Sequence, residues 1–155
     1  MPEVTDVPVE VVTRLRAICL TLPEAYEEPA WTGIRWLVRG RTYAHVLAVR
    51  SGWPPAYARA AGTDGPATVL TFRSTGPELA ALGHTGPPFF PTPWRSDEVG
   101  LLLDDEPDWT EITELLTESY RARAPRNLVA LLDRNTPQPP EPAPAPVEND
   151  VVVIE

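Results

Sequence analysis

The sequence predicts an α+β fold, in which an antiparallel β-sheet of about four or five strands packs against N-terminal and C-terminal helices. Apolar residues recur at helical spacing over residues 11–22 and again over residues 109–132. Residues 34–49 alternate apolar and polar side chains on either side of a tight turn, which is typical of a β-hairpin. Two further apolar runs, at 67–72 and 99–103, lie between turn residues and indicate additional strands.

The chain of 155 residues has room for a single domain, which is expected to span residues 1–134. Residues 135–146 contain six prolines and almost no apolar side chains, so this segment is expected to be an extended, solvated linker. The last six residues, Asp150 to Glu155, read DVVVIE and have two interpretations. They are either a disordered end of the chain or a peptide that adds a strand to the sheet edge of a protein partner.

The first helix is expected from Val11 to Leu22, with Asp6 available upstream as its cap and Pro23 ending it. Cys19 is the single cysteine of the chain and falls on the apolar face of this helix. We therefore expect a buried thiol, no internal disulfide, and a reducing compartment.

The hairpin that follows joins strands at 34–38 and 42–49 through a turn at Gly40 and Arg41. One face of this hairpin is apolar and the other carries arginines. The 16-residue connection at 51–66 comes next, and loops of this length are usually functional or mobile.

The middle of the chain alternates short elements with proline-rich connections. A third strand is expected at 67–72, and Thr75 and Gly83 bracket a short helix. Residues 86–94 contain too many prolines for regular structure, and a fourth strand follows at 99–103.

The C-terminal part is expected to hold two helices. Asp108 and Glu111 form a capping pair for a helix that begins at Trp109, and Pro125 starts a last helix that turns its leucines inward.

Three segments carry a family resemblance: WTEITELLTESYRARAPRNLVALLD at 109–133, LTLPEAYEEPAW at 20–31 and VRGRTYAHV at 38–46. With these segments the chain resembles the MmcQ/YjbR family of small bacterial proteins, which are commonly described as DNA-binding. The resemblance covers about residues 12–133 and implies a frataxin-like (CyaY-like) arrangement of the sheet and helices, with DNA as the partner.

The chain departs from the family pattern at positions where the family carries basic residues. Arg95 is followed by Ser96 and then by two acids, Asp97 and Glu98, and a single base, Arg126, stands after the Ala-Pro pair. The whole chain has a net charge of −9. Without residues 133–155, which hold five acids and one base, 17 acids still face 12 bases. Such a domain needs its arginines gathered on one face to bind a polyanion.

Few residues suggest catalysis. His45 and His84 are the two histidines, and neither has a second histidine or a thiolate at metal-ligand spacing. The chain has no Ser-His-Asp order, P-loop or dinucleotide glycine motif. The acids at 104–108 are interpreted as capping groups at a helix start rather than as cation ligands. We therefore predict no catalytic residue, no metal site and no cofactor.

Arginine binds phosphate and guanine through its planar fork of donors, so arginines are the candidates for nucleic-acid contacts. They are Arg35, Arg39, Arg41, Arg50, Arg73, Arg121, Arg123 and Arg126. The alternative for these residues is ordinary ion pairing at the surface. Aromatic side chains on the two loops are the candidates for stacking on bases or for lining a groove. They are Trp53, Tyr57, Phe89 and Trp94.

Two functional hypotheses remain from the sequence. The first is a non-enzymatic DNA-binding module that uses the hairpin arginines and the junction of the last two helices. The second is a domain that binds a protein or a small ligand through the loops at 51–66 and 86–94 and through the C-terminal tail. No apolar run is long enough to span a membrane, so we expect a cytoplasmic protein, and we expect it to be a monomer.

Overall fold

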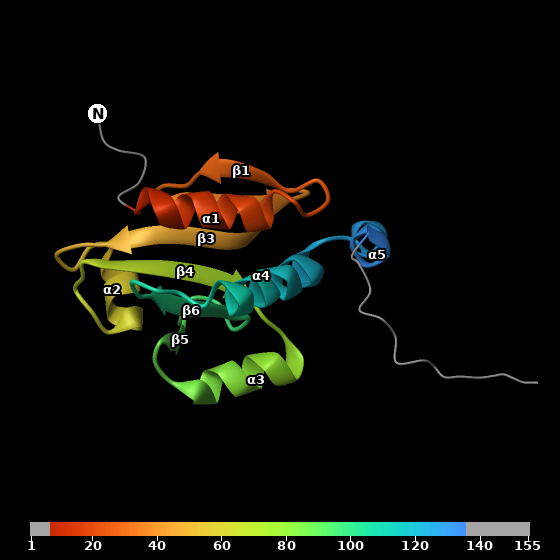
Figure 1. Ribbon diagram of the computed structural model, residues 1–155. Helices are drawn as coiled ribbons and strands as arrows, with labels where there is room; N and C mark the ends of the chain where they lie inside the picture. The colour runs from red at the N-terminus through yellow and green to blue at the C-terminus, as the bar shows by residue number, and fades with distance from the viewer. Residues whose placement is uncertain (1–6, 136–155) are drawn as a thin grey trace, which may run out of the picture.

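The computed structural model describes residues 7–135, which form five helices and six strands. The helices are α1 (Val9–Cys19), α2 (Pro55–Ala61), α3 (Gly76–Thr85), α4 (Trp109–Arg123) and α5 (Arg126–Asn135). The strands are β1 (Tyr26–Pro29), β2 (Ile34–Val38), β3 (Arg41–Val49), β4 (Ala67–Arg73), β5 (Phe89–Pro91) and β6 (Glu98–Leu103). The predicted α+β class is confirmed. The segments expected as the hairpin, the first helix and the two C-terminal helices form those elements (Figure 1).

All six strands belong to one antiparallel sheet with the order β1-β2-β3-β4-β6-β5. The hairpin turn consists of Arg39 and Gly40, which both have positive φ, at 51° and 80°. Two positive φ values in a two-residue loop suit the right-handed twist of the flanking strands. The register of β2 against β3 shifts between Trp36 and Leu37, where the ladder is irregular.

One face of the sheet packs against α1 and α4 and forms the main core (Figure 1). Trp36, Phe72 and Tyr120 are almost fully buried there. Each such side chain contributes roughly 1.5–3 kcal/mol by leaving water. The hydroxyl of Tyr43 donates to the backbone carbonyl of Cys19 at 3.0 Å, and the ring of Tyr43 meets that of Tyr120 edge-on with centroids 5.5 Å apart. Cys19 is buried, as expected, and burial raises the pKa of its thiol to about 12.

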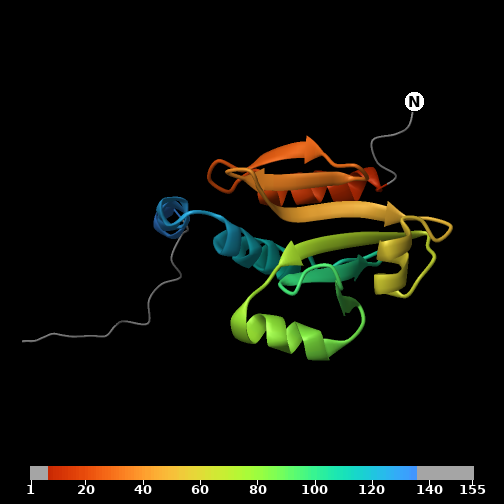
Figure 2. The same ribbon diagram turned by 180° about the vertical axis from the view of Figure 1, so that it is seen from behind.

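The opposite face is covered in part only (Figure 2). Tyr57 and Ala58 of α2 pack on Leu47, Val69 and the ring of Phe90, which makes a second, smaller core at one end of this face. The sheet surface next to α2, over β2 and β3, carries no helix in the described part of the chain (Figure 2). That uncovered surface is where polar and aromatic side chains gather.

The sheet has six strands rather than the four or five expected from the sequence. β1 (Tyr26–Pro29) reads YEEP, a segment with two glutamates that does not resemble a strand, and its glutamates are held by arginines of neighbouring elements. β5 (Phe89–Pro91) lies in the stretch expected to be irregular. It is an edge strand, where a proline costs no ladder hydrogen bond.

Two other expectations about the elements are corrected. The connection at 51–66 is not an open loop, because Pro55 begins the short helix α2. α1 begins at Val9 after Pro8 and ends at Cys19, three residues before the expected end. The proposed cap Asp6 and the tail at 136–155 lie outside the described residues.

Candidate functional site

The uncovered face of the sheet carries a pocket of about 410 Å³, here called the sheet-face pocket. Its walls come from segments that are far apart in the sequence. It is lined by Pro29, Ala30, Trp31, Arg35, Thr42, His45, Tyr57, Arg73, Trp94, Arg95 and Glu98.

The floor of the pocket is set by strand register. Arg35 of β2 stands opposite His45 of β3, and His45 in turn stands opposite Thr71 of β4. Arg73 of β4 stands opposite Glu98 of β6. Because side chains on one face of adjacent strands lie close together, four strands present polar groups to the same space.

Aromatic rings form the rim. Trp31, in the β1–β2 connection, lies edge-on to Trp53 with ring centroids 5.7 Å apart, and 6.3 Å from the ring of Tyr57. Tyr57 also meets Trp94 edge-on at 4.8 Å. The three tryptophans are exposed, at 68 % for Trp31, 53 % for Trp53 and 38 % for Trp94. Contiguous exposed aromatic rings are rare on soluble proteins unless they bind something.

Trp31 is positioned by the backbone at Gly33. A Cβ at Gly33 would lie 1.9 Å from the carbonyl oxygen of Val46, and its φ of +77° is unfavourable for other residues. The amide of Ala30 donates to the carbonyl of Gly33 at 3.0 Å, which closes the turn. The β1–β2 connection therefore lies flat on β3 and holds Trp31 over the pocket.

Glu98 orders the side chains on the opposite wall. Its Oε1 accepts from Trp94 Nε1 at 2.6 Å and from Thr92 Oγ1 at 3.1 Å, and it lies 4.0 Å from Arg95 Nε. With these hydrogen bonds the carboxylate fixes the indole at the rim.

His45 lies in the floor and is 8 % exposed. Its Nε2 lies 2.7 Å from the carbonyl oxygen of Thr32, and because a carbonyl only accepts, Nε2 carries the proton. Burial lowers the pKa of His45 below its usual value of 6.5, against a smaller raising effect of the Thr32 hydrogen bond. The imidazole is therefore neutral at neutral pH.

Arg35 and Arg73 each pair with one carboxylate and differ in how far they are buried. Arg35 Nη2 pairs with Glu28 at 2.7 Å and its Nη1 reaches Thr42 Oγ1 at 3.4 Å, while its Nε is buried without a hydrogen-bond partner. The side chain of Arg73 is 9 % exposed and contacts Asp97 at 3.2 Å. The residues that line the pocket include three arginines and one carboxylate. Each of these arginines has a carboxylate within 4.0 Å, which is Glu28 for Arg35, Asp97 for Arg73 and Glu98 for Arg95. The pocket therefore presents guanidinium groups whose charges are paired with neighbouring acids.

More positive charge lies where β3 begins and where β4 and α4 end. Arg41 Nη1 lies 3.5 Å from the carbonyl oxygen of Arg123, the last residue of α4. The pKa of Arg123 is lowered by burial and then by the charges of Arg73, Arg41 and Arg95, while Asp97 raises it. The Nε of Arg123 is buried and has no hydrogen-bond partner among the described residues.

Comparison with protein families matches residues 20–122 to the YjbR family. The chain belongs to the YjbR family. Comparison with curated proteins found no match. The match covers every residue that lines the sheet-face pocket, so the pocket lies within the part of the chain that defines the family.

The arginine candidates of this YjbR-family chain do not all converge. Arg35 and Arg73 line the pocket, and Arg41 and Arg123 lie beside it. Arg39 instead pairs with Glu24 at 2.7 Å, and Arg121 contacts Glu118 and Asp133. Arg126 is exposed at the start of α5.

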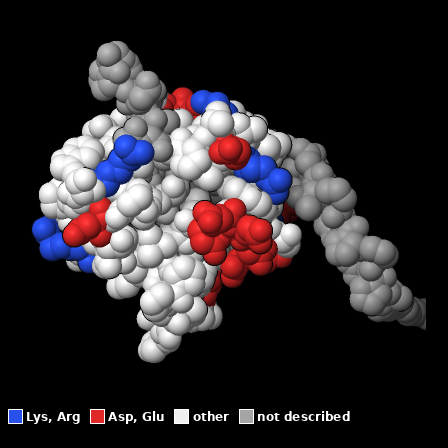
Figure 3. Space-filling view, turned by 60° about the vertical axis from the view of Figure 1, so that its left-hand side comes forward, with Lys and Arg blue, Asp and Glu red and all other residues white. Residues whose placement is uncertain are grey.

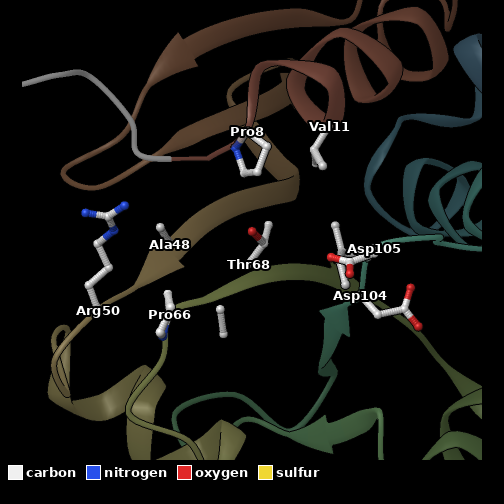
Figure 4. A pocket seen from close by; sticks show the side chains of 10 residues that line it. Pro8, Val11, Ala48, Arg50, Pro66, Thr68, Asp104 and Asp105 are labelled. Atoms are coloured by element: carbon white, nitrogen blue, oxygen red, sulfur yellow. The ribbon is translucent and has the colours of Figure 1, made fainter.

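Arg50 lies at the other end of β3. It lines a cavity of about 250 Å³ between the start of α1, the end of β3, the start of β4 and the end of β6. Figure 4 shows Arg50 at one end of this cavity and Asp104 and Asp105 at the other. Acidic side chains gather in one patch on the molecular face drawn in Figure 3. A phosphate backbone would be repelled there.

The aromatic candidates divide in a similar way. Tyr57 and Trp94 line the pocket, and Trp53 extends its rim through Trp31. Phe89 was expected on a surface loop, and that expectation is wrong, because Phe89 is 8 % exposed and packs in the main core. Its place in β5 explains the difference, since alternate residues of a strand point to opposite faces.

Sequence reasoning missed Trp31, His45, Arg95 and Glu98 as pocket residues. The position of His45 opposite Arg35 depends on the irregular register between β2 and β3. Trp31 follows the YEEPA segment, whose strand was not expected. The tryptophan that ends the segment LTLPEAYEEPAW was the one signal in the sequence for a binding role.

The described residues hold no group of three or more His, Cys, Asp or Glu side chains arranged for a metal ion. No helix within residues 7–135 has the length and apolar character needed to cross a membrane.

Proposed function

We propose that this YjbR-family protein is a non-enzymatic binding domain whose sheet-face pocket takes a small organic anion with a flat ring. The observation that supports it is the convergence of exposed indoles and three arginines on one pocket. A volume of about 410 Å³ lies within the roughly 300–1,000 Å³ that small-molecule sites usually have.

The two chemistries of the pocket call for two properties of the ligand. Trp31 and Trp94 offer apolar faces and edges that favour a planar ring. Arg35, Arg73 and Arg95 favour negative charge, and the neutral His45 adds none. A flat ring with an acidic substituent satisfies both groups at once.

The five tryptophans provide an internal test by NMR of their indole N–H signals. We expect 2-naphthoate to shift the signals of Trp31 and Trp94, which are at the rim, and not that of Trp36, which is fully buried in the core. We expect 2-naphthol, which is neutral, and cyclohexanecarboxylate, which lacks a flat ring, to bind at least ten-fold more weakly. A ten-fold weaker affinity corresponds to a loss of about 1.4 kcal/mol of binding free energy for each missing property.

The control variants separate binding from folding. Trp31→Ala removes an exposed side chain and should weaken 2-naphthoate binding without unfolding the protein. Trp109→Phe changes a tryptophan on the other side of the sheet and should leave binding unchanged. Equal binding of all three compounds, or shifts at Trp36 as large as at Trp31, would refute the proposed function.

DNA binding, which the family resemblance implies, is the second candidate. The group of Arg41, Arg73, Arg95 and Arg123 favours it, because these charges lie together at one end of the sheet. Its test is the salt dependence of fluorescence anisotropy with labelled duplex and single-stranded DNA. Binding that strengthens steeply as salt is lowered, and falls in Arg41→Gln, would support it. No binding at low salt would refute it.

We further propose that the domain acts in the cytoplasm as a monomer. A protein partner that binds the DVVVIE tail belongs to the same proposal, and the tail lies outside the described residues. Light scattering of the purified chain checks the monomer, which a dimer mass would contradict.

A further inference from the structure

We infer that Arg41, Arg73, Arg95 and Arg123, here called the arginine group, form a subsite for the phosphomonoester of the pocket ligand. This inference rests on the proposed function, since it names the anionic group of the ligand that the sheet-face pocket takes. The ligand class is then a phosphomonoester attached to a flat ring.

The four residues of the arginine group come from three elements and one connection. Arg41 begins β3, Arg73 ends β4, Arg123 ends α4, and Arg95 lies between β5 and β6. These element ends lie at the end of the sheet opposite α2 (Figure 2). The guanidinium of Arg41 reaches the carbonyl of Arg123, and Arg73 and Arg95 both line the pocket. Arg123 is close enough to Arg73 and Arg95 for their charges to lower its pKa. The group is therefore continuous with the pocket.

The described acids leave the arginine group with an excess of positive charge. Two carboxylates stand close to it, Asp97 on Arg73 and Glu98 at 4.0 Å from Arg95. Glu98 also accepts hydrogen bonds from Trp94 and Thr92. Four guanidiniums against two carboxylates leave two positive charges, which is the charge that a phosphomonoester dianion neutralises.

The donors of the arginine group are incompletely used. Arg123 Nε is buried without a hydrogen-bond partner. Arg73 is nine-tenths buried and uses Nη1 for Asp97. A buried donor without an acceptor costs free energy, and an anion bound beside Arg123 would supply acceptors.

The number of guanidiniums favours a dianion over a singly charged anion. The four guanidiniums come from three elements and one connection. A phosphomonoester has three terminal oxygens that accept hydrogen bonds from several arginines at once, and it carries about two negative charges above its second pKa. A sulfonate has the same tetrahedral shape but one charge, and a carboxylate has one charge and two oxygens. The ring of the same ligand then lies toward Trp31 and Trp94 at the rim.

The test compares 2-naphthyl phosphate with 2-naphthalenesulfonate by titration calorimetry on the full chain, at a pH above the second phosphate pKa of about 6. We expect the phosphate to bind at least ten-fold more tightly. We expect Arg123→Gln and Arg41→Gln each to remove most of that preference. Arg59→Gln, an exposed arginine on α2 that does not line the pocket, makes the same charge change and should keep it.

Arg41 is exposed, so Arg41→Gln keeps the test valid if Arg123→Gln does not fold. Equal affinities for phosphate and sulfonate, or an unchanged preference in both variants, would overturn the phosphate subsite. If the sulfonate still binds at Trp31 in that case, the proposed function stands, because the ligand's ring then occupies the part of the pocket next to Trp31 and Trp94 although no phosphate subsite exists.

A second pair of ligands distinguishes the two sources of such a phosphate. Adenosine monophosphate against adenosine tests a free nucleotide, and a single-stranded oligonucleotide with or without a 5′-phosphate tests the end of a strand. A ten-fold preference for the phosphorylated member of either pair supports the subsite and identifies the source. No preference in either pair counts against a nucleotide ligand.

Discussion

At the scale of single residues, His45 links the pocket to the stability of the protein. The residue stands among Arg35, Tyr57 and Glu98, and its Nε2 donates to the carbonyl of Thr32. A neutral imidazole satisfies this arrangement, while a charged one would be buried near the guanidinium of Arg35. The floor of the pocket is thus built for the unprotonated histidine.

The pH dependence of unfolding follows from His45. Its pKa is lower in the folded protein than the value of 6.5 in the unfolded chain, so the unfolded chain takes up a proton first as pH falls. We expect the free energy of unfolding to decrease as pH is lowered from neutral through 6.5, where the unfolded chain takes up the proton, until the folded imidazole is protonated as well. Urea denaturation at several pH values measures the decrease.

His45→Gln is the control for this decrease, because glutamine does not titrate. The pKa values of Glu24 and Glu27 are lowered from their usual 4.5, so these carboxylates change stability at lower pH than His45 does. A His45→Gln variant that retains the full decrease as pH is lowered through 6.5 would show that another group titrates.

At the scale of elements, α4 is tied to the sheet by one hydroxyl. Ser119 Oγ donates to the carbonyl of Tyr43 in β3 at 2.5 Å and accepts from the amide of Arg73 in β4 at 2.8 Å. Ser119 is fully buried. The contact fixes the start of β3 and the end of β4 against α4, where the arginine group lies.

Ser119→Ala should therefore destabilise the protein although it removes one atom. The carbonyl of Tyr43 and the amide of Arg73 lose their partner, and we expect the free energy of unfolding to fall by about 1–3 kcal/mol. Thr113→Ala on the exposed side of α4 is the matched control and should change stability by less than about 0.5 kcal/mol. Equal urea midpoints for both variants would contradict the prediction.

The elements that sequence reasoning found are those with local signals. Asp108 caps α4 by accepting from the amide of Glu111 at 3.0 Å. The hairpin forms as expected, but its two-residue turn is Arg39 and Gly40 rather than Gly40 and Arg41, because Arg41 already pairs with Val38 as the first residue of β3. β1 and β5 lacked such signals. β1 is stabilised by Glu27, which binds Arg16 of α1 at 2.8 Å and Trp36 Nε1 of β2 at 3.0 Å. β5 is stabilised by Phe90, whose ring packs over Gly100.

At the scale of the whole molecule, both cores draw their buried side chains from residues between Val7 and Leu132. We expect a chain that ends at Asn135 to unfold at the same urea concentration as the full chain, because none of these side chains is removed. Circular dichroism during urea denaturation of both chains measures the two midpoints. A lower midpoint in the shortened chain would show that residues 136–155 contribute to the fold.

The charge of the molecule is unevenly distributed. The net charge is −9, yet three arginines line one pocket together with Glu98, and Glu28 and Asp97 pair with two of them from outside the lining. The overall acidity suggested by itself that a polyanion would be repelled, whereas the clustering of arginines at one pocket supports the proposed site for a small anion. The arginine and aromatic hypotheses, which were separate at the level of sequence, meet at Arg35, Arg73, Tyr57 and Trp94.

The amino-acid sequence by itself determined the α+β class, the hairpin, the two long helices and the family, because these depend on spacing and capping between near neighbours. Only the tertiary structure decided which side chains share the pocket. Trp31, His45 and Glu98 are brought together by the strand order and by the irregular register of β2 against β3. Contacts between distant segments depend on how the strands pair, and local patterns do not encode that pairing.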